Sequence, residues 1–197
     1  MKILLIPFIP FTLFFVVAAL ILTSCGEKEH PETIRFSRNR IERGEQLVSE
    51  GRCNYCHTPT KGTAEGTVPD EDRLLSGHPS DEKIPDIPKV PVGSQQWLEF
   101  QSNLSNTVWA GPWGVSFSTN LTPDKETGIG TWTVKDFANA MRTGKHAGFG
   151  RKILPPMPWS DYSHLSDEDL ISIFAYLKSI KPVKNRVPDP IKFDERP

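Results

Sequence analysis

The chain has 197 residues, which is enough for one domain of ordinary size together with a targeting segment. Hydrophobic residues make up 37% of it and charged residues 24%, which is a globular composition and excludes a wholly disordered chain. Because 23 basic and 24 acidic side chains nearly cancel, the sequence gives no support to nucleic-acid binding.

The first segment of the chain is apolar. Residues 3–22 carry no charge and follow Lys2, as in a secretory signal segment or a membrane span. The run ends in Leu22-Thr23-Ser24-Cys25, which resembles a bacterial lipobox. We therefore expect residues 1–24 to be a lipoprotein signal peptide and Cys25 to carry lipid, with an uncleaved membrane span or simple secretion as the alternatives. Residues 25–37 are polar and are predicted to be a lipidated tether, which places the folded part at a membrane of the bacterial cell envelope, outside the cytoplasm.

The folded part begins with a predicted helix over residues 39–51. Apolar residues recur there at helical spacing, and Gly51 is a typical residue at a helix C-terminus. Gly44 in the middle of the helix costs roughly 1 kcal/mol relative to alanine. We therefore expect another element to pack closely against Gly44.

A C-x-x-C-H motif follows this helix directly. Cys53, Cys56 and His57 have the spacing of a c-type haem attachment site, where two thiols form thioethers to the porphyrin and the histidine binds the iron. A zinc knuckle would need a second ligand pair, and the chain has no other C-x-x-C. A redox dithiol normally follows a βαβ pattern, which the sequence lacks. We predict one covalent haem c, bound by both cysteines, with His57 as an axial ligand.

The middle of the chain is rich in proline. Within the loop 58–95, residues 83–92 carry a proline at every third position, which predicts an extended segment of polyproline type. Loops of this length are usually functional, and we expect this one to wrap a haem edge. His78 lies in it beside glycine and proline, and solvent exposure is favoured over iron ligation.

A short helix is predicted over residues 94–103, with Ser94 as its N-cap. The aromatic residues that follow, Trp109, Trp113 and Phe117, are separated by small and turn-forming residues. Such side chains can lie against a flat macrocycle or form ordinary core, and core is the simpler interpretation for each of them.

Two methionines beyond the signal segment are candidates for the second axial ligand. Met141 falls on the apolar face of a predicted helix over 134–143, so core packing is favoured. Met157 lies in Pro155-Pro156-Met157-Pro158, where prolines prevent a helix and stiffen the backbone. We predict Met157 as the sixth ligand, because methionine opposite histidine suits an electron carrier. His146 and His164 are the alternatives.

The last predicted helix begins at the N-cap Ser166 and ends before Pro182. Its apolar face is expected to cross the helix at 39–51, so that Gly44 approaches Ile173 or Tyr176. The residues from 183 onward are rich in proline and charge and are predicted to form a surface strap.

Taken together, these motifs resemble the class I cytochrome c family. The resemblance covers residues 38–187, with 188–197 left as a C-terminal tail. Its later motifs are similar to those of cytochrome subunits of membrane-bound alcohol and aldehyde dehydrogenases, although those subunits often carry several haem domains and this chain has one C-x-x-C-H. The motifs that carry the narrower similarity are Asn120-Leu121-Thr122-Pro123-Asp124, Thr127-Gly128-Ile129-Gly130-Thr131-Trp132, Met157-Pro158-Trp159 and Leu165-Ser166-Asp167-Glu168-Asp169-Leu170.

The resemblance implies an all-α, cytochrome c-like fold with crossing N- and C-terminal helices and long loops around the haem. It also implies electron transfer rather than an enzyme activity, with Cys53, Cys56, His57 and Met157 holding the haem. The expected partners are redox proteins that donate and accept electrons, such as a membrane dehydrogenase or oxidase complex, and the lipid bilayer through Cys25. A peroxidase-like haem enzyme or a haem sensor is the alternative, and either would need an open sixth position at the iron. Arg142, Lys145 and Arg151 are candidate partners of the haem propionates.

Overall fold

The computed structural model of the protein describes residues 36–192. Cys25, the expected signal peptide at 1–24 and the tether up to residue 35 lie outside the described residues, as does the end of the tail from 193. Between residues 36 and 192, no helix is long and apolar enough to cross a membrane.

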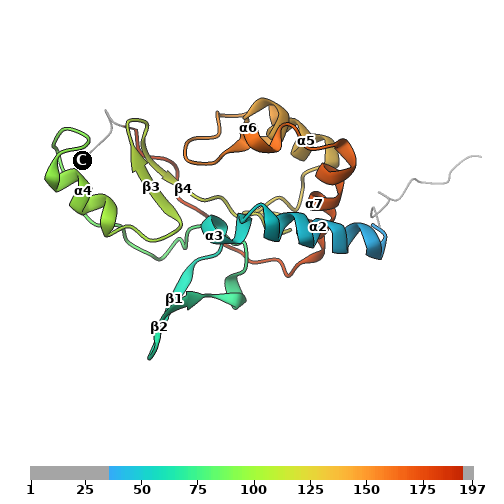
Figure 1. Ribbon diagram of the computed structural model, residues 1–197, viewed down its shortest axis with the longest axis horizontal. Coiled ribbons are helices and arrows are strands. Elements are labelled where there is room, and N and C mark those ends of the chain that lie inside the picture. The colour runs from blue at the N-terminus through green and yellow to red at the C-terminus, as the bar shows by residue number, and fades with distance from the viewer. Residues whose placement is uncertain (1–35, 193–197) are drawn as a thin grey trace, which may run out of the picture. The chain divides into compact units, whose positions relative to one another are not determined.

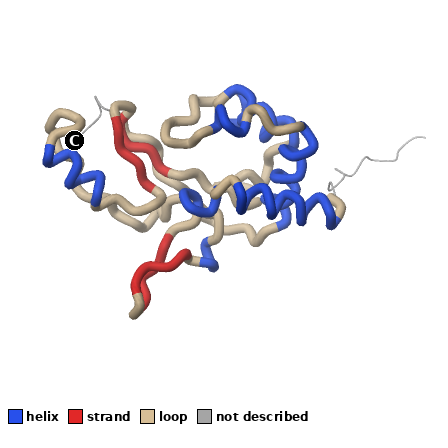
Figure 2. Tube along the Cα trace, in the orientation of Figure 1, coloured by secondary structure: helices blue, strands red, loops and turns tan. Residues whose placement is uncertain are grey.

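Helices make up most of the regular structure (Figures 1 and 2). The α-helices are α2 (Arg38–Glu50), α3 (Cys53–His57), α4 (Gln95–Ser102), α5 (Val134–Thr143), α6 (Trp159–Tyr162) and α7 (Asp167–Ser179). Two 3-10 turns, η1 (Glu71–Arg73) and η2 (His146–Gly148), complete the helical elements of the described region. The four long helices lie close to the positions predicted from sequence, and a capping box of Thr133 and Asp136 begins α5.

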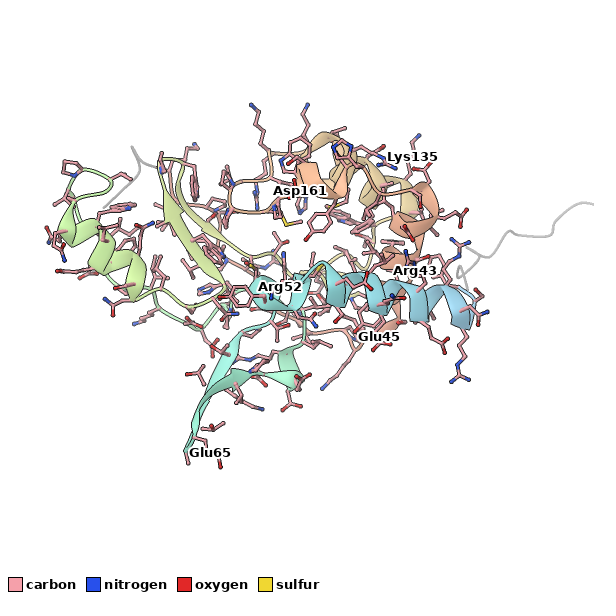
Figure 3. All side chains as sticks on the ribbon, in the orientation of Figure 1. Arg43, Glu45, Arg52, Glu65, Lys135 and Asp161 are labelled. Carbon is pink, nitrogen blue, oxygen red and sulfur yellow. The ribbon has the colours of Figure 1, made fainter. Side chains whose placement is uncertain are left out.

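The prediction of an all-α fold is wrong in one respect, because the structure also contains two antiparallel hairpins. Strands β1 (Thr60–Thr63) and β2 (Gly66–Pro69) form the first, which projects from the helices with Glu65 at its tip (Figure 3). Strands β3 (Val108–Gly111) and β4 (Gly114–Phe117) form the second, in which Val108 pairs with Phe117. The aromatic segment makes a hairpin because Gly114 adopts φ +102° after a two-residue loop, a conformation that side chains disfavour.

Helices α2 and α7 cross at Gly44, as the sequence predicted. A Cβ atom on Gly44 would clash with the carbonyl oxygen of Ser172 and lie 2.8 Å from the Cβ of Tyr176. Arg43 on α2 also pairs with Asp169 on α7, with 3.0 Å between the charged atoms. The crossing buries a helical cluster of side chains, comprising Val48, Leu75, Ile129, Phe137, Leu170, Ile173, Phe174 and Leu177.

A second group of buried side chains lies around the β3–β4 hairpin and α4. Trp97 is fully buried there and packs against Phe100, with ring centroids 5.5 Å apart. This hairpin cluster comprises Ile87, Trp97, Phe100, Val108, Ala110, Val115 and Phe117. In Figure 1, α4 and the β3–β4 hairpin lie on one side of the described region, and α2, α5, α6 and α7 lie on the other.

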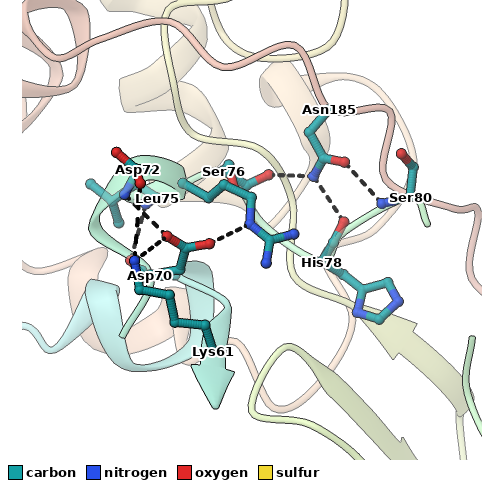
Figure 4. A network of polar contacts seen from close by, with 10 residues as sticks. Lys61, Asp70, Asp72, Leu75, Ser76, His78, Ser80 and Asn185 are labelled. Atoms are coloured by element: carbon teal, nitrogen blue, oxygen red, sulfur yellow. Dashed lines mark hydrogen bonds and ion pairs between the residues drawn. The ribbon is translucent and has the colours of Figure 1, made fainter. Parts of the chain in front are cut away.

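The segment after α7 runs back to the hairpin and is fixed by polar contacts. Asn185 is buried, and its Nδ2 donates to the carbonyls of Ser76 (2.7 Å) and His78 (2.8 Å) (Figure 4). Its Oδ1 accepts a hydrogen bond from the Ser80 amide at 3.0 Å. Further along, Ile191 forms a β-bridge with Val115 in β4. The strap therefore joins the loop 76–80 to the second hairpin.

Candidate functional site

The C-x-x-C-H motif forms the short helix α3, which is held at both ends by side chains from distant segments. Before the helix, the Tyr162 hydroxyl donates to the carbonyl of Gly51 at 2.7 Å. After it, the Asn106 amide donates to the carbonyls of Tyr55 (2.7 Å) and Thr58 (2.8 Å). The contacts of Asn106 occupy carbonyls at the C-terminal end of α3, which a helix of five residues cannot satisfy itself.

His57 is buried, and one of its ring nitrogens is already bonded. Its side chain lies 2.8 Å from the carbonyl oxygen of Thr119 through Nδ1. A carbonyl only accepts, so Nδ1 carries the proton and Nε2 keeps the lone pair that a metal requires. Burial lowers the pKa of His57, and the bond to Thr119 opposes that shift only in part. The neutral tautomer is therefore the stable one near neutral pH.

Thr119 is positioned by a close approach of the loop 74–78. The amide of Gly77 donates to the carbonyl of His57 at 2.8 Å, and the amide of His78 donates to the carbonyl of Ser118 at 2.9 Å. Gly77 has φ +77°, and a Cβ atom there would clash with Ser118 and Thr119. Gly77 is therefore required where this loop contacts both the backbone of His57 and the backbone of Ser118 and Thr119.

Met157 lies on a loop that is fastened to the second hairpin. The hydroxyl of Ser116 in β4 donates to the carbonyl of Pro155 at 2.7 Å. On the other side, the amide of Trp159 donates to the carbonyl of Met157 at 2.9 Å. The Trp159 ring packs directly over Gly144 at the end of α5, where any Cβ atom would meet it. The methionine is thus held between the hairpin and α5.

Cys53, Cys56, His57 and Met157 all lie on the wall of one cavity of about 350 Å³. A smaller cavity of about 120 Å³ shares Cys56, His57 and Met157 with it, so the two adjoin, and we call them the larger and smaller lobes of one hollow. Most of the other lining side chains are apolar and come from both halves of the domain. They include Val48, Trp109, Leu121, Phe137, Met141, Leu170, Ile173 and Leu177 in the larger lobe, and Phe117, Ile129 and Trp132 in the smaller one.

The residues of this hollow fit a covalently attached haem. A flat, largely apolar macrocycle needs apolar walls, which both lobes provide. Burial raises the pKa of Cys53 to about 11 and also raises that of Cys56, so both are thiols at neutral pH. Trp109 lines both lobes, and its buried Nε1 has no partner among the described residues. An indole N–H left unbonded at a cavity wall is a donor for a polar group of a ligand, such as a carboxylate.

The histidines proposed as alternative iron ligands lie in different places. His146 lines the smaller lobe together with Met157 and meets Trp132 edge-on, with ring centroids 4.9 Å apart. His164 is exposed and lines neither lobe. His78 lines neither lobe and is fully buried, with Nδ1 2.9 Å from the Thr107 hydroxyl. Its predicted exposure was wrong, because the strap residue Asn185 and the hairpin enclose the loop that carries it.

The three candidate propionate partners also differ in their positions relative to the cavity. Arg142 is occupied, since its guanidinium pairs with Asp167 at 2.7 Å and also bonds the carbonyl of Ser163. Lys145 lines neither lobe, whereas Arg151 lines the smaller one. Arg151 and Arg186 also line a third cavity of about 300 Å³ that shares Thr119 and His146 with the smaller lobe. Arg186, like the Thr119 carbonyl, gave no signal in the sequence, because its place depends on the strap.

Comparison with known proteins identifies relatives that are named as cytochromes or as dehydrogenase subunits. No protein-family model matches the chain. The chain is 41% identical over 81 residues to the cytochrome c subunit of a quinone-dependent alcohol dehydrogenase from Gluconobacter oxydans, covering 40% of this chain and 17% of that protein. A nicotinate dehydrogenase subunit from Pseudomonas putida is 29% identical over 153 residues, covering 78% of this chain and 10% of that protein. A diheme cytochrome c-type protein from Cereibacter sphaeroides is 24% identical over 155 residues, or 79% of this chain and 41% of that one.

The chain thus spans between a tenth and less than half of the length of these relatives. Fructose and gluconate dehydrogenase cytochrome subunits also match it, each over 75 residues. Apart from the nicotinate dehydrogenase subunit, these relatives are cytochrome subunits of dehydrogenases and a diheme cytochrome, which supports a c-type cytochrome with haem c and a role in electron transfer.

Proposed function

We propose that this protein is a membrane-tethered, single-haem c-type cytochrome that carries electrons between redox proteins and is not itself an enzyme. In this proposal Cys53 and Cys56 form the thioethers, and His57 and Met157 are the axial ligands. The observation that carries it is the common cavity. All four side chains lie on its apolar wall, and His57 has Nδ1 bonded to Thr119 so that Nε2 is available.

When bound, the haem supplies a one-electron iron couple. The chain's own residues keep the surroundings constant while the charge on that group changes. The Thr119 carbonyl fixes the orientation of the His57 ring, and the Ser116 hydroxyl fixes the loop that carries Met157. The apolar lining excludes water, which together with a methionine ligand favours a high potential.

We infer the partners from the relatives, whose names place them in dehydrogenases. We propose a dehydrogenase of this kind as the electron donor and a membrane oxidase as an acceptor. The nearly neutral net charge of the chain gives no support to nucleic acid as a partner. Lipid on Cys25 would hold the protein at the surface of a membrane in the cell envelope. Labelling with palmitate tests this anchor: Cys25→Ala is expected to abolish labelling and release the protein, and an unlabelled wild-type chain would contradict it.

The central test of the haem site substitutes sulfur without changing volume. Met157→Leu is expected to remove the methionine–iron absorbance band and to lower the midpoint potential by more than about 59 mV, a factor of ten for one electron. Met141→Leu is the matched control, because Met141 lines both lobes but belongs to α5, where core packing accounts for it. Loss of the band in Met141→Leu and not in Met157→Leu would exchange their roles.

Two further results test the covalent attachment of the haem and the identity of the sixth iron ligand. Acidic solvent should leave the haem attached in the wild type, and should extract it when Cys53 and Cys56 are both replaced by alanine. His146→Ala should leave the spectrum unchanged, since we assign the sixth position to Met157. A spectrum that changes only in His146→Ala would point to His146 as the ligand, and a vacant sixth position in the wild type would favour a haem enzyme or sensor.

A further inference from the structure

The loop between α5 and Met157 carries an unusual charge pattern. Between Asp136 and Asp161 the chain has four basic residues and no acidic one, although 23 basic and 24 acidic residues balance over the whole chain. Arg142 is neutralised by its ion pair with Asp167. The other three, Lys145, Arg151 and Lys152, are exposed and take part in none of the ion pairs found between residues 36 and 192. We call residues 145–152 the basic loop.

The backbone of the basic loop brings these charges together. Lys145 and Lys152 face each other across an isolated antiparallel bridge, in which like charges oppose each other at a cost in stability. Next to this bridge, the two ends of the basic loop are joined by a hydrogen bond from the amide of His146 to the carbonyl of Arg151 at 2.9 Å. No acidic residue lies within the loop, so a negative surface would be attracted to it.

Phe149 lies in the middle of the basic loop and is 81% exposed. The loop around it is fixed, because the amides of Gly148 and Gly150 donate to the carbonyls of Lys145 and His146, both at 2.8 Å. Ala147 adopts φ +51° to make this turn, a conformation that costs free energy for a residue with a side chain. One exposed phenylalanine is common on protein surfaces. A phenylalanine held outward and surrounded by three cations outside the described ion pairs matches an interface with an aromatic centre and a polar rim.

The basic loop is also an outer wall of the haem cavity. His146 and Arg151 line the smaller lobe, as do Ile153 and Leu154 on the way to Met157. A protein bound to the loop would therefore sit beside the segment that carries the proposed iron ligand. Electron transfer requires a short distance between the two redox centres. A lipid surface bound to the basic loop would instead keep a redox partner away from this wall.

We propose that the basic loop is the docking surface for an acidic redox protein, with Phe149 as its apolar centre and Lys145, Arg151 and Lys152 as its charged rim. The proposal rests on the proposed function and adds to it the chemistry of the partner. Complementary charge of this kind mainly raises the rate of association, and this effect decreases as salt screens the charges.

Small redox ions test the charge. In Lys145→Glu/Lys152→Glu, oxidation of the reduced protein by hexacyanoferrate(III), an anion, is expected to slow about tenfold at low ionic strength. Oxidation by the cationic tris(phenanthroline)cobalt(III) is expected to accelerate. Both effects should shrink as salt is added, because the Debye length falls to about 10 Å at 0.1 M.

The matched control is Lys83→Glu/Lys89→Glu, which makes the same change in net charge at two exposed lysines of the proline-rich segment. We expect this control to change either rate less than about twofold. Equal effects in the two double variants would show that only net charge matters and would overturn the docking surface.

A gold electrode coated with mixed carboxylate- and methyl-terminated thiols tests the apolar centre. Phe149→Ser is expected to reduce the coverage of electroactive protein about threefold on the mixed layer and to leave it unchanged on a pure carboxylate layer. Leu98→Ser is the control, since Leu98 on α4 is 51% exposed. The same loss in both variants, or no loss in Phe149→Ser, would overturn the role of Phe149.

The haem spectrum separates this proposal from the function on which it rests. A wild-type protein without covalent, reducible haem would refute the proposed function before any docking rate is measured. Normal haem in all variants, with no difference between the two lysine pairs, would refute the docking surface alone. Sedimentation with vesicles of anionic phospholipid that is lost in Lys145→Glu/Lys152→Glu would assign the loop to a membrane and overturn the protein partner.

Discussion

The two hydrophobic clusters of the domain differ in how they serve the site. The helical cluster joins α2, α5 and α7, and it supplies the larger share of the apolar cavity wall, including Phe137 and Leu170. The hairpin cluster is built around Trp97 from α4, β3 and β4. It supplies fewer wall residues, yet the contact that fixes the Met157 loop comes from Ser116 in β4. The helical cluster therefore encloses most of the cavity that we propose for the haem, and the hairpin positions the loop of one proposed ligand.

The other ligand shows the same division. His57 ends α3, which follows α2 of the helical cluster, but its Nδ1 bonds to Thr119, two residues beyond β4. Each proposed axial ligand thus depends on a polar contact from the hairpin side. A change in either cluster is expected to reach the iron, by a different route.

The largest effect is expected from Trp97→Ala in the hairpin cluster. Trp97 is fully buried, and replacing such a tryptophan with alanine costs about 4 kcal/mol of unfolding free energy through lost burial and the cavity left behind. Because Ser116 couples this cluster to Met157, we expect helical circular dichroism and the methionine–iron band to be lost in one transition. Denaturant titration followed by both probes measures this.

Leu98→Ala is the control for that experiment, because the neighbouring side chain is 51% exposed and should change stability by less than about 0.5 kcal/mol. Two separate transitions in Trp97→Ala, with the band retained in the first, would show that the hairpin cluster does not hold the methionine.

A somewhat smaller effect is expected from Gly44→Ala in the helical cluster, about 3 kcal/mol. The new methyl group would strike the Ser172 carbonyl, which is backbone and moves only if α7 shifts away from α2. Such a shift carries Ile173 and Leu177 out of the wall of the larger lobe. We expect thermal unfolding at lower temperature and a haem band that is shifted but present.

Gly62→Ala controls for the loss of a glycine, because a Cβ atom there meets nothing within 4 Å. Its unfolding temperature should stay close to that of the wild type. Destabilisation by Gly62→Ala as large as that by Gly44→Ala would remove the helix crossing as the cause.

The helical cluster was predictable from sequence, whereas in the hairpin cluster only the helix α4 and the burial of Phe117 were, for a physical reason. Helical periodicity and caps are local signals, so α5 and α7 and the glycine at the crossing could be located before the structure was known. The aromatic segment 109–117 has no such period, and its turn depends on Gly114. The four site residues could be proposed from sequence because motif spacing and proline placement are also local. The Thr119 carbonyl has no side-chain signature. Lys145 and Arg151 were interpreted as propionate partners and not as a surface, because the charges cancel in the whole-chain sum.

The smallest effect is expected at the strap that joins the two clusters. Asn185→Ala removes both donors to the carbonyls of Ser76 and His78 and the acceptor of the Ser80 amide. Buried groups left unpaired cost about 2 kcal/mol together, since water can enter as the strap loosens. The loosening should be local, because α2 and α7 make no use of these bonds. We therefore expect amide hydrogen exchange to rise at residues 76–80 and at Val115, whose partner Ile191 lies further along the strap, while α7 keeps its protection.

Asn103→Ala is the matched control, because the Asn103 side-chain amide donates to the Glu99 carbonyl at 2.7 Å on the exposed side of α4. Faster exchange in α7 of Asn185→Ala would mean that the strap supports the helical cluster as well, and that the two regions are less separate than their packing indicates.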